Sequence, residues 1–255
     1  MNFLFFHQKE LISASTAELS GVRAQYVHEF HKLKEGETSQ AILGGVGRGS
    51  AKCLSASKTS FTFEVDFHEE EKASFPLTLV QGLSRPQTIK KVLQFGAMFR
   101  VERIILAPTF LGEKSYQQSK ILNEPEQMYE MIKGLEQVGN PFSPEVSVLG
   151  RFNDLFSLKG LPSRKFVACP GEPFSTFGKI LGKKEKWPES AVLAIGPEPG
   201  WSEQELHSLD EAGYESCSLG ADHLRVEVAL VSLLSQLSLW RDVGLAKESE
   251  SSTPS

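Results

Sequence analysis

Short, continuously apolar segments alternate with helical segments over most of this chain beyond residue 75. Three of them read "LTLVQGL" (77–83), "VERIILAP" (101–108) and "AVLAIGP" (191–197). A strand without polar alternation is buried on both faces, which is typical of parallel strands covered by helices. The pattern therefore predicts an α/β domain around a mostly parallel sheet, whose ligands bind at the carboxyl ends of the strands.

Further segments extend the same pattern. We expect strands at "EVSVL", "KFVACP" and "ESCSLG" and helices at 87–99, 124–139, 203–212 and 223–240. The helix at 124–139 opens on Glu and Pro and stops at Gly139, which are recognised start and stop signals.

Before about residue 70 the hydrophobic pattern is different, with apolar and polar side chains alternating at every second position. "FTFEVDF" (61–67) alternates large apolar with smaller or polar side chains, while "AILGG" and "SAKCLSA" flank a glycine cluster. Period-two patterning between glycine-rich and serine-rich turns predicts an all-β domain, a small antiparallel sheet or barrel. We expect domains at 1–72 and 73–245 and a disordered tail at 246–255.

Charge and cysteine content narrow the classes of function. The formal net charge of −5 gives no overall basic field, so any nucleic-acid binding must use local basic clusters. The three cysteines are far apart in sequence and offer neither a disulfide framework nor a metal site. No apolar stretch approaches the roughly 20 residues of a membrane span. We expect a cytoplasmic protein that uses no membrane and no metal.

The stretch "AIGPEPGWSEQEL" (194–206) joins a buried strand to a well-specified helix. Ser202 is a good N-cap, and Glu205 completes a capping box. Trp201 and Leu206 occupy the positions of a hydrophobic staple. The glycines of the turn let a ligand approach the backbone. A stiff turn without a ligand is the alternative interpretation.

A second stretch, "SLGADHLRVEVALVSLL" (218–234), repeats this design of strand end, glycine turn and apolar helix. Arg225 and Glu227 are expected in the first turn of that helix, where side chains can face a site at the strand ends. Two such turns could enclose a flat ligand between backbone groups. The alternative is that Arg225 and Glu227 form a surface ion pair, worth at most about 1 kcal/mol.

Together, "IGPEPGWSEQEL" and "SLGADHLRVEVA" resemble the paired signatures of the RsmE family of SPOUT-class 16S rRNA methyltransferases. "GLEQVGNPFSPEV" and "HKLKEGE" are similar to weaker family motifs. The resemblance implies a PUA-like β-barrel that holds RNA, followed by a SPOUT α/β domain with a C-terminal trefoil knot. It also implies a homodimer that uses S-adenosylmethionine to methylate N3 of a uridine in 16S rRNA of the small ribosomal subunit.

The resemblance also assigns residues to roles. The cofactor site would comprise Pro170, Ile195, Gly196, Pro197, Glu198, Gly200, Ser218, Leu219, Gly220, Leu224 and Arg225. Uracil N3 must lose a proton, so a cation near its carbonyl groups would help catalysis. Arg225 is the candidate for that cation, and Glu227 would orient it.

RNA contacts are expected from local basic clusters and from one amide. The candidates are Lys32, Lys34, Arg85, Lys90, Lys91, Arg100 and Gln137. The alternative for each basic cluster is an ordinary solvated helix face.

Several positions depart from the family pattern. Pro199 stands where the family has glycine, which removes an N–H group. Val228 replaces a threonine, Asn140 replaces an arginine, and Asp222 and His223 replace basic or apolar residues. Two functions therefore stay open, an active methyltransferase and a catalytically weakened homologue that serves as an RNA-binding or ribosome-assembly module. A third interpretation is an unrelated nucleotide-binding α/β protein.

Overall fold

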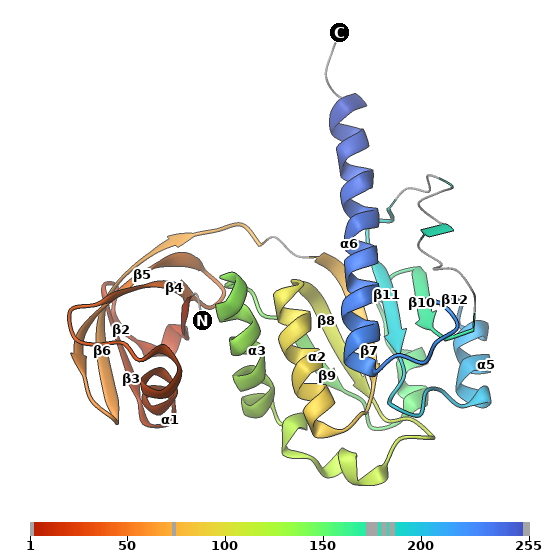
Figure 1. Cartoon of the computed structure of the whole chain (residues 1–255), viewed down its shortest axis with the longest axis horizontal. Coiled ribbons are helices and arrows are strands. Elements are labelled where there is room, and N and C mark those ends of the chain that lie inside the picture. The colour runs from red at the N-terminus through yellow and green to blue at the C-terminus, as the bar shows by residue number, and fades with distance from the viewer. Residues whose placement is uncertain (1–2, 73–74, 172–177, 180–182, 184–186, 252–255) are drawn as a thin grey trace. The chain divides into compact units, whose positions relative to one another are not determined.

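The computed structural model of the chain describes residues 3–72, 75–171, 178–179, 183 and 187–251. It divides into two compact units (Figure 1). Unit 1 comprises Met1–Ser74, Gly96–Arg100 and Met128–Pro144, and unit 2 comprises Phe75–Phe95, Val101–Gln127 and Glu145–Ser255. The first unit is therefore not the contiguous segment 1–72, because it also includes two later segments.

Unit 1 is built on a curled six-stranded mixed sheet. Its order is β1 (Leu4–Phe6), β4 (Thr38–Leu43), β5 (Gly47–Ala56), β6 (Ser60–Glu69), β3 (Thr16–Ser20) and β2 (Leu11–Ser13). The segments "AILGG", "SAKCLSA" and "FTFEVDF", whose patterning predicted β structure, contribute to β4, β5 and β6, respectively. Strand β1 pairs parallel with β4, whereas all other recorded pairs are antiparallel, so the sheet is mixed.

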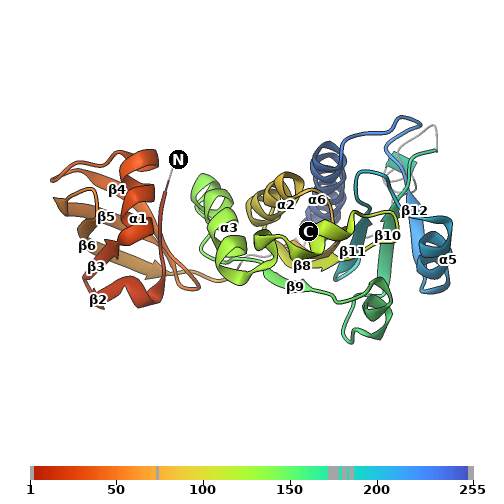
Figure 2. The same ribbon diagram turned by 90° about the horizontal axis from the view of Figure 1, so that it is seen from below.

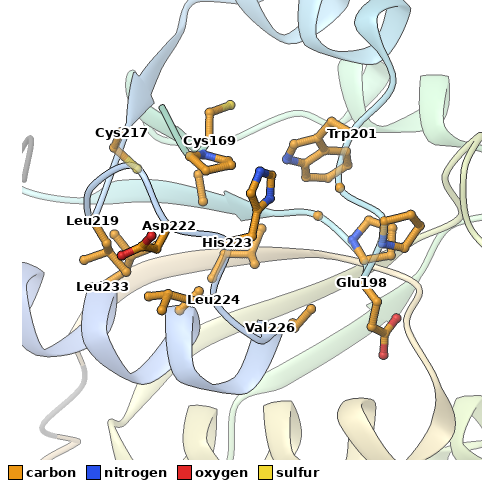
Figure 3. A pocket seen from close by; sticks show the side chains of 18 of the residues that line it. Cys169, Glu198, Trp201, Cys217, Leu219, Asp222, His223, Leu224, Val226 and Leu233 are labelled. Atoms are coloured by element: carbon orange, nitrogen blue, oxygen red, sulfur yellow. The ribbon is translucent and has the colours of Figure 1, made fainter. Parts of the chain in front are cut away.

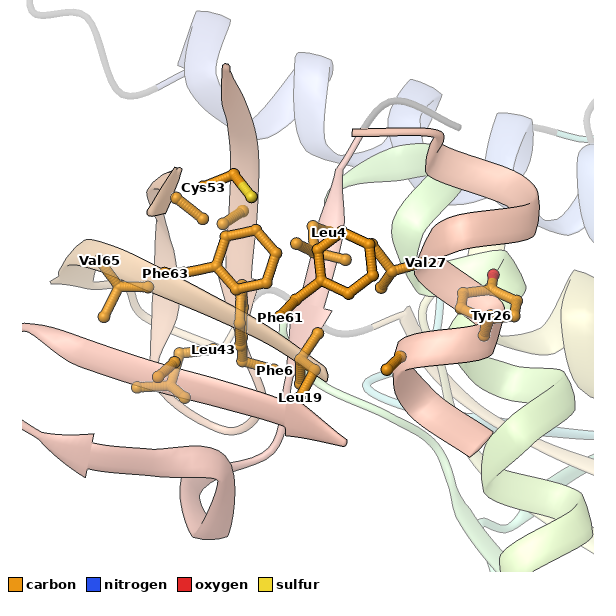
Figure 4. Close-up of a cluster of buried hydrophobic side chains, with 14 residues drawn as sticks. Leu4, Phe6, Leu19, Tyr26, Val27, Leu43, Cys53, Phe61, Phe63 and Val65 are labelled. Atoms are coloured by element: carbon orange, nitrogen blue, oxygen red, sulfur yellow. The ribbon is translucent and has the colours of Figure 1, made fainter. Parts of the chain in front are cut away.

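Aromatic side chains fill the core of unit 1 (Figure 4). Phe61 and Phe63 are buried and stack at 6.0 Å between ring centroids, while Phe6 meets Phe63 edge-on at 5.4 Å. These residues come from the inward positions of β6 and β1, as period-two alternation requires. The alternation in "FTFEVDF" is thus the pattern that builds this core.

Helical structure within the first 70 residues corrects the all-β expectation for this segment. A 3₁₀ helix covers Gln8–Glu10, helix α1 covers Gly21–Tyr26, and a π-helical turn covers Val27–His31. The Glu136 side chain of α3 (Glu124–Val138), wholly buried, accepts a hydrogen bond from the Tyr26 hydroxyl at 2.7 Å and lies 3.3 Å from His31 Nε2. Elements this short leave almost no periodic signal, because they rely on tertiary contacts.

Unit 2 contains a six-stranded sheet in which every recorded pair is parallel. Its order is β12 (Tyr214–Cys217), β10 (Arg164–Ala168), β11 (Ala191–Ile195), β7 (Phe75–Gly82), β8 (Val101–Ala107) and β9 (Glu145–Val148). The predicted parallel sheet is confirmed, including all six of its expected strands.

Both faces of this sheet are covered, as the continuous apolar strands predicted. Helices α2 (Pro86–Met98) and α6 (Val226–Ser251) lie on one face, where Trp240 meets Phe166 edge-on (Figures 1 and 2). The opposite face packs against the 3₁₀ helix η5 (Phe152–Ser157) and α5 (Glu203–Glu211). Two short 3₁₀ helices, η3 (Lys114–Gln118) and η4 (Lys120–Leu122), precede α3.

The last helix differs from its expected bounds at both ends. It begins at Val226, so Arg225 precedes its first turn while Glu227 lies within it. It continues to Ser251, so residues 246–251 of the expected disordered tail are helical, and residues 252–255 lie outside the described part. No helix in the described residues has the length and apolarity needed to cross a membrane.

Candidate active site

A cavity of about 350 Å³ lies at the carboxyl ends of β10, β11 and β12 in unit 2 (Figure 3). Its lining includes nine of the eleven residues expected to bind a cofactor: Pro170, Ile195, Gly196, Pro197, Glu198, Gly200, Leu219, Gly220 and Leu224. The two glycine turns found in the sequence thus line the same cavity. Neither Pro199 nor Trp201 plugs it, since both belong to its lining.

The first turn is held by a hydrogen bond from the Gly200 amide to the Pro197 carbonyl at 2.8 Å. Gly200 has φ +81°, a conformation that favours glycine. Pro199 has no amide proton, yet the recorded turn bond comes from Gly200, so the proline removes no bond from the turn itself.

Glu198 belongs to the same turn, but its carboxylate points away from the cavity (Figure 3). Its Oε1 accepts hydrogen bonds from the Arg85 amide at 3.2 Å and the Thr88 hydroxyl at 2.9 Å. These groups lie at the start of α2, where a negative charge also interacts favourably with the helix dipole. The side chain therefore fixes the position of the turn, whose backbone faces the cavity.

The predicted capping box at the start of α5 is confirmed. The Ser202 hydroxyl accepts from the Glu205 amide at 3.2 Å, and Glu205 Oε2 accepts from the Ser202 amide at 2.8 Å. Trp201 and Leu206, the predicted staple positions, both line the cavity. The buried indole Nε1 of Trp201 has no hydrogen-bond partner among the described residues. The cavity wall thus includes a donor that a polar ligand could satisfy.

Gln81 and Gly82, at the end of β7, contact the first turn at Gly196 and Pro197. The Gln81 amide nitrogen donates to the Gly196 carbonyl at 3.2 Å, and this side chain is wholly buried. A Cβ on Gly82 would lie 2.6 Å from Cδ of Pro197, so only glycine permits this approach. Gln81 was not among the predicted site residues, although a polar side chain inside the apolar run "LTLVQGL" is a signal that could have pointed to it.

The second turn follows β12 and contains Gly220 with φ +126°. Ser218, one of the expected cofactor residues, is absent from the cavity lining because its hydroxyl closes the turn, donating to the Gly220 carbonyl at 2.9 Å. Asp222 and His223, which depart from the family pattern, do line the cavity. In Figure 3 the His223 ring projects into it beside Trp201.

Arg225 and Glu227 do not line the cavity. Arg225 is exposed just before α6, and Glu227 pairs with Lys91 of α2 at 3.0 Å instead of with Arg225. A hydrogen bond with its own backbone N–H group, followed by the bond from Lys91, lowers the pKa of Glu227. Neither the predicted orientation of Arg225 by Glu227 nor their surface ion pair is present among the described contacts.

The residues expected to contact RNA belong to both units. Lys32, Lys34, Arg100 and Gln137 are in unit 1, and Arg85, Lys90 and Lys91 are in unit 2. Lys32 borders a shallow groove together with Lys58 and His28. Arg85 is exposed at the start of α2, whereas Lys91 is already paired with Glu227.

Arg100 and Asn140 form a structural contact inside unit 1. Asn140 is wholly buried and donates to the carbonyls of Ala97 and Phe142, while its oxygen accepts from the Arg100 guanidinium at 3.3 Å. Burial, followed by the charge of nearby Arg48, lowers the pKa of Arg100. Asn140, which stands where the family pattern has an arginine, therefore ties together the backbone at Ala97 and Phe142 and does not face solvent.

Cys169 and Cys217 line the cavity, but their thiols are not activated for reaction. Burial raises the pKa of Cys169 and that of Cys217. A raised pKa keeps each thiol protonated at neutral pH, and the thiolate is the reactive form. These residues therefore contribute apolar surface rather than a nucleophile.

Comparison with known proteins identifies the class to which this fold and cavity belong. A family model described as "RNA methyltransferase domain" matches residues 70–238. The chain therefore belongs to this family of RNA methyltransferases.

Two relatives are similar to this chain along most of its length. The ribosomal RNA small subunit methyltransferase E of Treponema pallidum (strain Nichols) is 27% identical over 238 residues, covering 90% of this chain and 87% of the relative. Methyltransferase E 1 of Borreliella burgdorferi is 25% identical, covering 84% and 88%. The resemblance to the RsmE family is confirmed.

A solved structure shares the fold over nearly the whole chain. The small subunit methyltransferase E of Neisseria gonorrhoeae, bound to S-adenosyl methionine, superposes with a TM-score of 0.73 at 22% identity, covering 93% of this chain and 98% of that one. The arrangement of a curled mixed sheet and a parallel sheet is thus that of this family.

Proposed function

We propose that this protein transfers a methyl group from S-adenosylmethionine to N3 of a uridine in 16S ribosomal RNA. The observation that carries the proposal is that two glycine turns, from β11 and β12, wall one cavity of about 350 Å³ at the carboxyl edge of a parallel sheet. Cofactor sites are usually concave, about this size or larger, and lined by backbone and apolar groups with few polar ones.

The residues present fit this cofactor. A Cβ added to Gly200 or Gly220 would meet no atom within 4 Å, so both glycines border open space. The unpartnered indole N–H of Trp201 supplies a donor. The nine lining residues expected from the sequence would hold the adenosine and methionine parts, with Ser218 shaping the second turn from behind.

When bound, S-adenosylmethionine supplies an electrophilic methyl group that an attacking nitrogen can take by in-line displacement. The uridine must leave its stack to expose N3. Alignment of the two reactants by the cavity walls can contribute several kcal/mol, roughly 7–11 at best. Arg225 is the cation that stabilises the negative charge on the uracil oxygens. Glu227 keeps the start of α6 close to α2 through Lys91, and so places Arg225 indirectly.

His223 accepts the proton that uracil N3 loses in this mechanism. It projects into the cavity, where the other titratable lining groups are Glu198, Asp222 and the two protonated cysteines. The carboxylate of Glu198 is engaged at α2, and that of Asp222 lies near Leu219, away from the imidazole (Figure 3). Histidine is the side chain that most readily exchanges protons near neutral pH. The imidazole would take the N3 proton, and bound S-adenosylmethionine would supply the methyl group that the nitrogen gains.

Three further features complete the proposal. The chain works as a homodimer, its β12 segment and α6 form the trefoil knot of the SPOUT fold, and unit 1 serves as the PUA-like domain that holds RNA. The residues that contribute to RNA binding are Lys32, Lys34, Arg85, Lys90, Lys91, Arg100 and Gln137.

The decisive experiment offers small ribosomal subunits from cells lacking this methylation, with labelled S-adenosylmethionine, to the full-length protein. Label should appear in 16S rRNA at a single uridine, and nuclease digestion should release N3-methyluridine. Label at another position or in another RNA would overturn the assignment of the target atom or substrate.

A second function is favoured by one observation, the proline at 199. Its missing N–H removes one backbone donor from the turn that walls the cavity. A protein that binds S-adenosylmethionine and small subunits but transfers no label would be an RNA-binding or ribosome-assembly module. The transfer assay separates the two functions, because both predict that S-adenosylmethionine binds in calorimetry.

A further inference from the structure

A large aromatic side chain is exposed on the loop after β8. Phe110 has 80% of its surface in solvent and the adjacent Leu111 has 43%. Exposed apolar side chains on connecting loops are a common sign of binding surfaces, since loops carry much of a protein's function.

The backbone of this loop is held firmly. The Phe110 amide donates to Oε1 of Glu205 at 2.7 Å, and Glu205 is only 5% exposed. The other oxygen of this carboxylate accepts from the Ser202 amide and hydroxyl. One buried carboxylate thus caps α5 and fixes the loop. Its negative charge strengthens both sets of hydrogen bonds.

The start of α5 also connects this loop to the cavity. Trp201 and Leu206, which flank Ser202 and Glu205, line the cavity, and the Glu205 carboxylate reaches the Phe110 backbone. All of these residues lie in unit 2. The backbone of Phe110 is therefore held in place by the side chain of Glu205, whose neighbour Leu206 lines the cavity.

The connection that carries Phe110 also carries groups that suit a nucleic-acid base better than a protein. Six residues after Phe110, the half-buried Tyr116 hydroxyl bonds to the Glu113 carboxylate, which raises its pKa, and interacts with the guanidinium of exposed Arg85. Aromatic rings together with arginine are typical of surfaces that stack unpaired bases. Two exposed apolar side chains are too small a surface for a stable protein interface, which buries about 1,000 Å² or more.

We propose that Phe110 is a stacking platform for an unpaired base of the RNA substrate, next to the base that enters the cavity. This inference rests on the proposed function, because it takes the substrate to be RNA with a base extruded from its stack. Stacking on a prepositioned ring loses little conformational freedom, so it helps to hold the strand while the target base is presented.

The test compares Phe110→Ala and Phe110→Trp with the wild type, and uses Leu111→Ala as the matched control for loss of an adjacent apolar side chain. Three quantities are measured on the full-length protein: the Kd for undermethylated small subunits, the Kd for S-adenosylmethionine, and the methylation rate. Phe110→Ala should raise the subunit Kd about tenfold or more, the effect of losing one stacked base. Phe110→Trp and Leu111→Ala should stay within roughly threefold, and cofactor binding should not change in any variant.

Subunit binding by Phe110→Ala equal to that of wild type would overturn the proposal. A change from dimer to monomer in sedimentation, with Phe110→Ala alone, would instead make this loop a protein interface and also overturn it. If wild type transfers no label to RNA, the proposed function fails, while the effect of Phe110 on subunit binding is still measured separately.

Discussion

The carboxylate of Glu198 lies 2.9 Å from the Thr88 hydroxyl and also accepts a hydrogen bond from the Arg85 amide. A residue of the cavity turn is therefore anchored at the start of α2, more than a hundred positions earlier in the chain. Since this side chain is directed at α2, Glu198 contributes its backbone rather than its carboxylate to the cavity wall. The relationship makes the shape of the cavity depend on a helix that does not line it.

Replacing Glu198 should loosen this turn. Glu198→Ala removes the acceptor of two hydrogen bonds and is expected to lower the free energy of unfolding by about 1 kcal/mol, the usual cost of a lost helix cap. It should also weaken S-adenosylmethionine binding several-fold. Glu198→Gln keeps an acceptor oxygen and should fall between wild type and Ala. Denaturant unfolding and calorimetry measure the two effects, with exposed Glu102→Gln as the control.

The conformation of Gly200 allows a comparison with a matched control. Gly200 (φ +81°) and Gly160 (φ +75°) both adopt left-handed backbone with nothing within 4 Å of an added Cβ. Alanine at either position should cost about 1–2 kcal/mol of stability because of that backbone strain. Only Gly200→Ala should weaken cofactor binding, since Gly160 does not line the cavity. If Gly200→Ala and Gly160→Ala bound S-adenosylmethionine with equal affinity, the first turn would not be part of the cofactor site.

Arg225 is expected to act on the chemical step. Arg225→Ala should lower kcat about tenfold or more through loss of a stabilising charge, while the Kd for S-adenosylmethionine stays constant. Arg225→Lys keeps the charge and should recover part of the rate. Single-turnover transfer to small subunits is the measurement, with highly exposed Arg151→Ala as the control. An unchanged rate with cofactor bound would show that Arg225 has no catalytic part.

His223 should affect the chemical step. His223→Gln retains hydrogen bonding but cannot take a proton, so the single-turnover rate of transfer should fall while the Kd for S-adenosylmethionine stays constant. His223→Ile, which has an apolar side chain, should behave like Gln. An unchanged rate for His223→Gln would mean that the imidazole only shapes the cavity.

Alkaline pH should destabilise the folded protein, in part through Cys217. Burial raises the pKa of this thiol, so the folded form keeps a proton that the unfolded chain releases above about pH 8.5. The stabilising contribution is complete below that pH and declines as pH rises, by up to roughly 1.4 kcal/mol per pH unit. Denaturant unfolding of wild type and Cys217→Ala between pH 8 and 10.5 should show a shallower decline for the variant.

Local features of the sequence predicted much of the site. The capping box of Ser202 and Glu205 spans four residues and depends on backbone geometry that the helix itself imposes, so it could be found without tertiary information. The two glycine turns were equally visible, because strand, turn and helix follow one another directly. Their meeting in one cavity follows from the parallel sheet, in which carboxyl ends share an edge.

Long-range polar contacts were not predictable in this way. Glu198 pairs with Thr88 and Glu227 pairs with Lys91, and each pair joins residues more than a hundred positions apart. No local pattern distinguishes such a carboxylate from a solvated one. Sequence proximity suggested Arg225 as a contact of Glu227, while the packing of α6 near α2 provides Lys91.

The buried carboxylate of Glu136 has a practical consequence for dividing the chain. It bonds to Tyr26 and lies beside His31, both of which precede it by more than a hundred positions. A fragment truncated after residue 72 would retain the tyrosine and the histidine but lose their acid. The β-sheet unit therefore cannot be excised at residue 72 with its buried contacts intact. RNA-binding studies on such an amino-terminal fragment would use a protein that lacks the partner of Tyr26 and His31.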